Sequence, residues 1–187
     1  QKAKDNLTYK RYLNLEHNFF EVNEDGTTNY EKEHWKEVMN EFIIHYCEKN
    51  RAHIEQRVGG HVRIGDYEAI SGIAGSGRYL LLFKNQPKMR KVLEESLEYL
   101  VALTTDIEVD GHSVPGWYIS VEEQFLRADQ EKYPHGNFNL GLAHGIPGVL
   151  SLLSLALLEQ IEVPGQKRAI CKIVNWLRQF QIRVPER

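Results

Sequence analysis

Thiol and imidazole side chains are the groups in this sequence that could hold a metal or attack a substrate. The two cysteines, Cys47 and Cys171, lie far apart and form no Cys-x-x-Cys pair. A disulfide framework or a self-contained zinc site needs closer spacing, so neither is predicted, and a reducing compartment is expected. Both cysteines are most simply small, partly buried residues. Seven histidines show no ligand spacing with them: His17, His34, His45, His53, His61, His112 and His135.

Two glycine motifs indicate where helices begin. Ser71-Gly-Ile-Ala-Gly75 and His144-Gly-Ile-Pro-Gly148 share the pattern Gly-Ile-x-Gly, and each precedes an apolar stretch. Glycines three residues apart allow a tight turn, and a helix start presents free N–H groups and the positive end of a dipole. If both starts face one side, that side suits a functional site. A phosphate loop at Gly75-Ser-Gly77 is not favoured, because no clear strand precedes it and no Gly-Lys-Ser/Thr follows.

Hydrophobic periodicity predicts a mainly α-helical chain that positions these motifs. Apolar residues at three- and four-residue steps indicate amphipathic helices at about 31–50, 88–104 and 166–181. Two further stretches, 73–84 and 147–159, are apolar nearly all round and should be enclosed by other helices. This pattern predicts helical hairpins in two layers over 31–105 and 137–187. Two or so such units would not close a ring, so part of the architecture is expected to be missing.

Two segments interrupt the helical pattern. Residues 7–30 and 106–136 contain turn signals, including Asp110-Gly111, and short apolar runs that resemble strands. We expect either a small inserted lobe that contains β-structure or two long surface loops. Loops of this length are uncommon unless they have a function.

The composition excludes several classes of protein. The 187 residues include 23 Lys+Arg against 26 Asp+Glu, a formal net charge of -3. This near-neutral balance lacks the electrostatic footprint of a nucleic-acid binder. The longest apolar run, 149–158, is half the length needed to cross a bilayer, and no secretory signal is present. A cytoplasmic location is therefore expected, and both ends of the sequence are interpreted as cuts.

Three segments resemble a known family. Asn137-Phe-Asn-Leu-Gly-Leu-Ala-His-Gly-Ile-Pro-Gly148 closely resembles a hallmark of the lanthionine synthetase C-like proteins, the lantibiotic cyclases. Tyr67-Glu-Ala-Ile-Ser-Gly-Ile-Ala-Gly75 is similar to an earlier motif of that family. The stretch from Tyr118 to Gly136 resembles the segment before the hallmark, with a closer likeness to the subtilin type of cyclase than to the nisin type. The resemblance covers most of 31–182 and implies a partial α/α toroid of helical hairpins with a small inserted SH2-like lobe.

The resemblance also implies a reaction and its residues. The family adds a peptide cysteine thiol across dehydroalanine or dehydrobutyrine to make a thioether ring, and a zinc ion presents the thiolate. His144 matches the family's active-site histidine, and Glu68 takes the place of its aspartate, with Asp66 as the fallback. On residue type alone, a histidine near a helix start is more simply a hydrogen-bonded one, and either carboxylate is more simply solvated or a cap. The hallmark around His144 favours the catalytic interpretation.

The family's zinc ligands, a cysteine and a later Cys-His pair, have no counterpart at Cys47 or Cys171. The resemblance therefore implies the central part of a cyclase about twice as long, with zinc in the full-length protein and none on this inactive portion. Expected partners are a lantibiotic precursor peptide and the dehydratase and transporter of a biosynthetic complex, which could hold the protein peripherally at a membrane.

Two other functions stay open. The first is a module that binds the leader region of a precursor peptide through exposed aromatic residues, namely Trp117, Tyr118 and Tyr133. Packing of the lobe is the simpler role for Trp117. The second is a structural helical-repeat protein without catalysis. An open partial toroid would also expose apolar surface, which predicts self-association.

Overall fold

The computed structural model describes residues 20–22, 27–33, 35–55, 62–124 and 126–182. The chain divides into two compact units, 1–45 and 46–187. The boundary falls within the helix α2 (Trp35–Glu55). The fold is mainly helical, as the sequence predicted.

The described part of the first unit contains a two-stranded antiparallel sheet and the start of α2. Strand β1 (Phe20–Val22) pairs with β2 (Thr28–Glu33). The prediction of a helix from residue 31 is wrong, because 31–33 belong to β2 and α2 begins at Trp35. The apolar helical spacing starts only at Trp35, whereas β2 contains Thr28 and Tyr30, which favour strands. Residues 7–19 and 23–26 of the predicted insertion lie outside the described residues.

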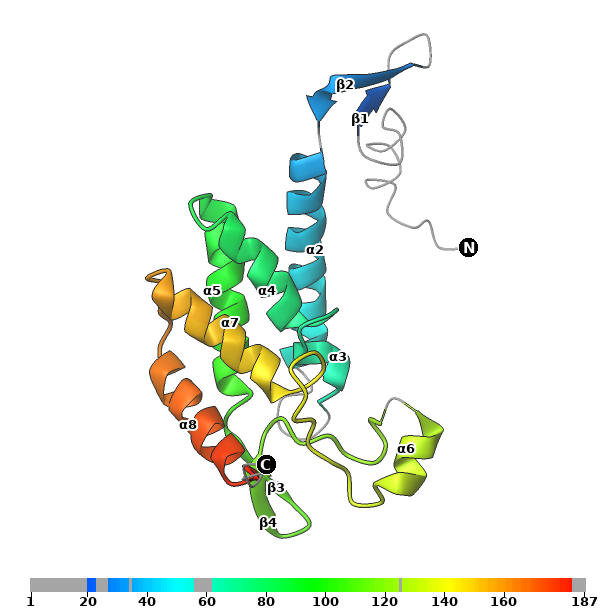
Figure 1. Cartoon of the computed structure of the whole chain (residues 1–187), viewed down its shortest axis with the longest axis vertical. Coiled ribbons are helices and arrows are strands. Elements are labelled where there is room, and N and C mark those ends of the chain that lie inside the picture. The colour runs from blue at the N-terminus through cyan, green and yellow to red at the C-terminus, as the bar shows by residue number, and fades with distance from the viewer. Residues whose placement is uncertain (1–19, 23–26, 34, 56–61, 125, 183–187) are drawn as a thin grey trace, which may run out of the picture. The chain divides into compact units, whose positions relative to one another are not determined.

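Two helical hairpins dominate the second unit (Figure 1). Helix α4 (Ile73–Leu82) is followed by α5 (Pro87–Ala102), and α7 (Ile146–Leu158) by α8 (Gln166–Arg178). The bounds lie within a few residues of the predicted ones. Helix α4 packs against α5 and α7, and α7 also packs against α5 and α8. The two apolar helices are therefore neighbours, and the amphipathic helices flank them. Closure into a toroid stays a prediction.

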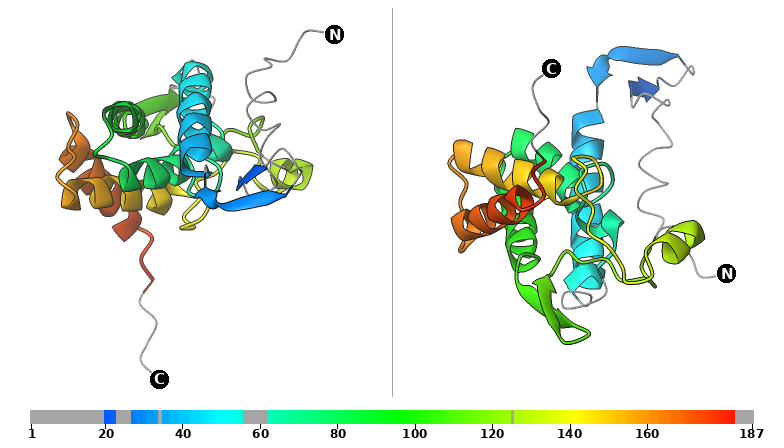
Figure 2. Two further views of the ribbon diagram at one scale, coloured as in Figure 1. Left: turned by 90° about the horizontal axis from the view of Figure 1, so that it is seen from above. Right: turned by 60° about the horizontal axis from the view of Figure 1, so that its bottom comes forward.

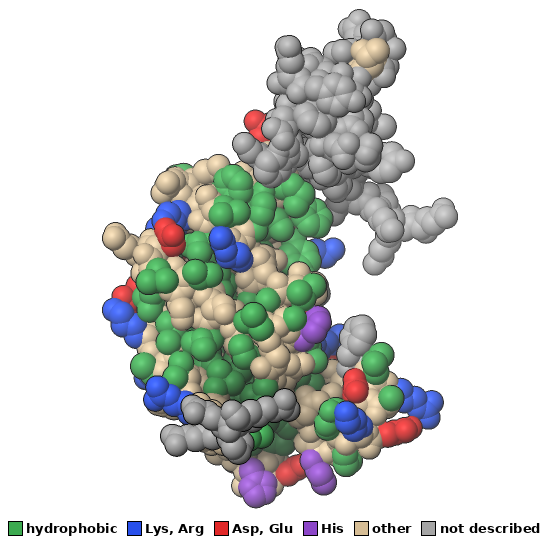
Figure 3. All heavy atoms as spheres, in the orientation of Figure 1, with side chains coloured by type: hydrophobic (Ala, Val, Ile, Leu, Met, Phe, Trp, Pro, Cys, Tyr) green, Lys and Arg blue, Asp and Glu red, His purple; other side chains and the backbone are tan. Residues whose placement is uncertain are grey.

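The core of this unit lies between the hairpins. Helices α4 and α7 approach closely, since a Cβ on Gly77 would lie 2.4 Å from a methyl group of Leu152. The enclosure predicted for the two apolar helices is incomplete, because Leu82 is 63% exposed and Leu158 is 78% exposed. Both residues end their helices, where no neighbour covers them within the part of the chain that is described. Figure 3 shows hydrophobic side chains on the face over α4 and α7. Self-association remains a prediction.

The segment 106–136 is only partly regular. Strands β3 (Asp106–Val109) and β4 (His112–Pro115) form an antiparallel hairpin, and α6 (Arg127–Lys132) follows (Figure 2). The two turn residues between the strands, Asp110 and Gly111, have φ of 51° and 77°. Positive φ at both positions matches the twist of a hairpin, so the turn signal was correct. The SH2-like identity of this segment stays a prediction.

Aromatic packing joins this segment to α8. The rings of Trp117 and Trp176 lie 5.2 Å apart between centroids, and those of Phe138 and Trp176 lie 5.0 Å apart. Trp117 is fully buried. The hypothesis of an exposed peptide anchor is therefore wrong for Trp117, and packing is its observed role. A buried indole contributes large apolar contact area.

No helix in the described ranges has the length and apolar character needed to span a bilayer.

Candidate active site

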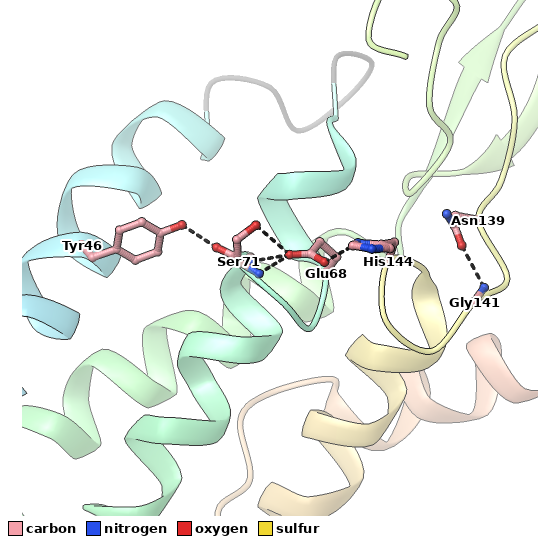
Figure 4. Close-up of polar contacts among 7 residues, drawn as sticks. Tyr46, Glu68, Ser71, Asn139, Gly141 and His144 are labelled. Carbon is pink, nitrogen blue, oxygen red and sulfur yellow. Dashed lines mark hydrogen bonds and ion pairs between the residues drawn. The ribbon is translucent and has the colours of Figure 1, made fainter. Parts of the chain in front are cut away.

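Two loops, one before α4 and one before α7, hold the candidate catalytic residues. The short helix α3 (Ile64–Tyr67) leads directly into Glu68, and His144 directly precedes Gly145, the N-cap of α7. The backbone N–H of Ala69 donates to the carbonyl of Ala143 at 2.9 Å, which ties the loops together. This tie brings Glu68 and His144 side by side although 76 positions separate them (Figure 4).

The Glu68 carboxylate and the His144 imidazole form a direct pair. His144 Nδ1 lies 2.7 Å from Glu68 Oε2. The Glu68 side chain is 2% exposed and the His144 side chain is 58% exposed. An ionised carboxylate can only accept hydrogen bonds, so Nδ1 must carry a proton, and in the neutral form of the ring Nε2 is then the acceptor. The pair therefore offers a base to solvent while its orienting carboxylate is buried.

The second carboxylate oxygen of Glu68 binds the start of α4. Glu68 Oε1 accepts hydrogen bonds from the Ser71 N–H, from Ser71 Oγ at 2.9 Å and from the Gly72 N–H at 2.9 Å. Burial by itself raises the pKa of this carboxyl, but the hydrogen bonds from Ser71 and its loop and from His144 outweigh burial and lower the pKa below its ordinary value. Glu68 is thus held as a carboxylate.

Glycine is required where each loop turns into its helix. A Cβ on Gly72 would lie 2.4 Å from the backbone nitrogen of Glu68, and one on Gly145 would lie 2.1 Å from the carbonyl oxygen of Asn139. Neither approach is possible for a residue with a side chain. The loop before α7 is also closed by Asn139, whose Oδ1 accepts from the Gly141 N–H at 2.8 Å (Figure 4).

The other predicted site residues lie elsewhere. Asp66 is buried, and its Oδ2 accepts from the Arg63 N–H at 2.9 Å, a capping contact at the start of α3. Tyr118 donates its hydroxyl to the His135 carbonyl at 2.8 Å. Tyr133 is half-buried, with Lys132 Nζ 4.9 Å from its ring centroid. Contact of Tyr118 or Tyr133 with a peptide stays a prediction.

Sequence reasoning did not identify Ser71 or Tyr46 as parts of the site. Tyr46, on α2, donates its hydroxyl to the Ser71 carbonyl (Figure 4). One signal was available for Ser71, since it directly precedes the first glycine of its motif, as His144 does. Tyr46 carried no such signal, because it belongs to an amphipathic helix that is distant in sequence.

The zinc implied by the family resemblance does not fit the residues that the structure describes. Burial raises the pKa of the Cys47 thiol to about 11, which disfavours the thiolate that zinc binds. Cys171 is exposed on α8. Within the described ranges, no three His, Cys, Asp or Glu side chains gather to hold a metal ion.

Comparisons with known proteins identify the family of the chain. The family model described as "Lanthionine synthetase C-like protein" matches residues 20–186. The chain is 26% identical over 117 residues to Nisin biosynthesis protein NisC of Lactococcus lactis subsp. lactis, an alignment that covers 63% of this chain and 27% of that protein. A solved structure named Nisin cyclase matches with a TM-score of 0.65 and 27% identity, over 78% of this chain and 35% of that one.

The chain thus spans about a third or less of the length of these two relatives. The family match nevertheless extends over both hairpins and both loops of the candidate site. On this match, together with the pairing of Glu68 and His144 at the two motifs, the chain belongs to the lanthionine synthetase C-like family.

Proposed function

We propose that this chain supplies the acid–base pair of a lantibiotic cyclase, which adds cysteine thiols to dehydrated residues of a precursor peptide. One observation carries the proposal: the exposed imidazole of His144 is held at 2.7 Å by the buried carboxylate of Glu68. Family membership and the similarity to nisin cyclase support it.

The reaction requires one net proton transfer. The cysteine sulfur bonds to the β-carbon of dehydroalanine or dehydrobutyrine, and the π electrons of the C=C bond move toward the α-carbon. His144 Nε2 accepts the thiol proton and returns a proton to the α-carbon, so the atoms balance and nothing leaves. Glu68 keeps Nδ1 protonated and stabilises the imidazolium between these two transfers. A positioned acid–base group typically contributes about 10²–10⁴-fold.

The surroundings of the pair suit a peptide. Ile70 is 67% exposed and Leu142 is 64% exposed, and both adjoin the Ala69–Ala143 tie. Such side chains can contact apolar residues beside the cysteine or the dehydrated residue. The proposal thus assigns a dehydrated, cysteine-containing precursor peptide as substrate. The proposal has four further elements. Zinc is held by the longer protein, and this portion alone lacks activity. The protein works with a dehydratase and a transporter, and its location is cytoplasmic.

The test is His144→Ala in the complete cyclase polypeptide that contains this chain. Ring formation is measured on a dehydrated precursor peptide by mass spectrometry after alkylation of the remaining thiols. We expect the rate to fall at least about 100-fold, because the proton carrier is lost. His112→Ala is the matched control, since His112 is an exposed histidine on β4. Ring formation at the normal rate in the His144 variant would contradict the proposal and favour a structural module.

A further inference from the structure

We propose that Ser71 is a positioning residue that holds the Glu68 carboxylate turned toward His144. This inference rests on the proposed function, since it assigns Ser71 a role in the same acid–base site. Ser71 would not touch the substrate and would act through Glu68.

Both hydrogen-bond donors of Ser71 reach the Glu68 carboxylate. Both its N–H and its hydroxyl donate to Glu68 Oε1, while Oε2 accepts from His144 Nδ1. With Oε1 fixed, rotation of the carboxylate about its last torsion is blocked, and Oε2 remains directed at the imidazole (Figure 4). Hydrogen bonds to an ionised group are stronger than neutral ones, so these contacts also favour the charged form.

The loop that carries Ser71 is held from its other side. The hydroxyl of Tyr46 donates to the Ser71 carbonyl, so the peptide plane after Ser71 is anchored on α2. A Cβ on Gly75 would lie 2.4 Å from the carbonyl oxygen of Ala69, which shows how tightly α4 begins against this loop. Ser71 itself is exposed, so its hydroxyl does not fill the core.

The repeat supports this assignment independently. Ser71 and His144 occupy the same place, directly before the first glycine of each motif. Both residues donate to Glu68, one to each oxygen. The Glu68 carboxylate therefore lies between equivalent positions of the two repeats. The Ser71 hydroxyl donates to one of its oxygens, and the His144 imidazole contacts the other.

A structural role and a positioning role differ in what Ser71→Ala would change. The variant keeps the backbone donor and loses only the hydroxyl. Loss of a structural contact would lower the free energy of unfolding and leave the titration of Glu68 unchanged. Loss of a positioning contact raises the pKa of Glu68, because one hydrogen bond to its ionised form is gone.

The experiment measures two properties of Ser71→Ala, Ser71→Thr and Ser151→Ala. The Glu68 carboxyl is titrated by carbon NMR in this 187-residue chain, and the pH–rate profile of ring formation is recorded in the complete cyclase. Ser71→Thr retains the hydroxyl. Ser151→Ala is the control, because Ser151 is an exposed serine on α7 whose hydroxyl donates to the Pro147 carbonyl.

We expect Ser71→Ala to raise the pKa of Glu68, because one hydrogen bond to its ionised form is lost. The rate of ring formation should fall about tenfold, the effect of one charge-assisted hydrogen bond. Ser71→Thr should restore both properties, and Ser151→Ala should change neither. An unchanged Glu68 titration in Ser71→Ala overturns the inference even if His144→Ala abolishes ring formation. A shifted titration alongside full activity of His144→Ala supports the positioning of Glu68 and refutes the proposed function.

Discussion

The starts of α4 and α7 have the same glycine pattern but satisfy their backbone donors differently. At α4, the side chain of Glu68 accepts the N–H groups of Ser71 and Gly72. At α7, a backbone carbonyl is the acceptor instead, since the Gly145 N–H donates to the Gly141 carbonyl at 2.8 Å. Pro147 in the first turn of α7 has no N–H to satisfy.

The difference explains why one start holds a buried carboxylate and the other an exposed ring. Glu68 is drawn inward because the donors at α4 need an acceptor. The backbone of the α7 loop satisfies its own donors, so the side chain of His144 is free to project outward and meet Glu68 across the tie. The same glycine motif thus precedes a helix with a buried carboxylate, Glu68, in one repeat and a helix with an exposed imidazole, His144, in the other. The following predictions test this division of roles.

Glu68→Gln should have the largest effect, because it removes the negative charge that accepts hydrogen bonds from the start of α4 and from His144. We expect ring formation in the complete cyclase to fall about 100-fold. The free energy of unfolding should also decrease by about 1–3 kcal/mol, since a buried amide group would face N–H donors. Rates and urea unfolding check both effects. Glu98→Gln, at an exposed glutamate on α5, is the control. Equal rates for the two variants would refute the shared role of Glu68.

Glu68→Asp tests whether side-chain length matters here. The glutamate reaches the donors of α4 with one oxygen and His144 with the other. A side chain shorter by one methylene should lose one of these contacts, and we expect about a tenfold lower rate of ring formation. A crystal structure of the variant would show which contact is lost. Full activity would mean that the loop adjusts freely to the shorter side chain.

The last glycine of each motif should be intolerant of a side chain, and the α4 start should be the more sensitive. A Cβ on Gly75 would lie 2.4 Å from the Ala69 carbonyl oxygen, and one on Gly148 would lie 2.8 Å from the Leu142 carbonyl oxygen. We expect each Ala variant to lose about 1–3 kcal/mol of unfolding free energy, with the greater loss at Gly75. Gly65→Ala is the control, because its Cβ would meet nothing within 4 Å. Thermal unfolding of all three variants measures whether a side chain destabilises the two helix starts equally.

The smallest expected effect is a pH dependence of stability that belongs to α4. The pKa of Glu68 is lowered in the folded chain, so its hydrogen bonds stabilise the fold above the ordinary pKa of a glutamate. This contribution should disappear as the pH falls through the folded pKa. Glu68→Gln should lack that part of the acid dependence, whereas His144→Ala should retain most of it, since the donors at α4 remain. Urea unfolding at several acidic pH values measures the difference.

Local signals correctly predicted the two helix starts beside the candidate site. The two glycine motifs predicted both helix starts, since turns and first-turn geometry depend on neighbouring residues. The same signals did not distinguish Asp66 from Glu68, because either carboxylate could cap a helix. The strand at 31–33 was also missed, because its pairing partner lies elsewhere in the chain. The burial of Trp117 depends on contact with Trp176 on a distant helix.

By itself, the sequence determined the helical hairpins, the two glycine turns and the family likeness, because periodicity and motif spacing are properties of neighbouring residues. Only the tertiary structure decided that Glu68 is buried, that it is paired with His144 and that Ser71 is its second partner. The Ala69–Ala143 hydrogen bond brings these distant loops together, and the resulting contacts hold the Glu68 carboxylate in its ionised form. No pattern along the chain encodes that contact, since it arises when the two hairpins pack.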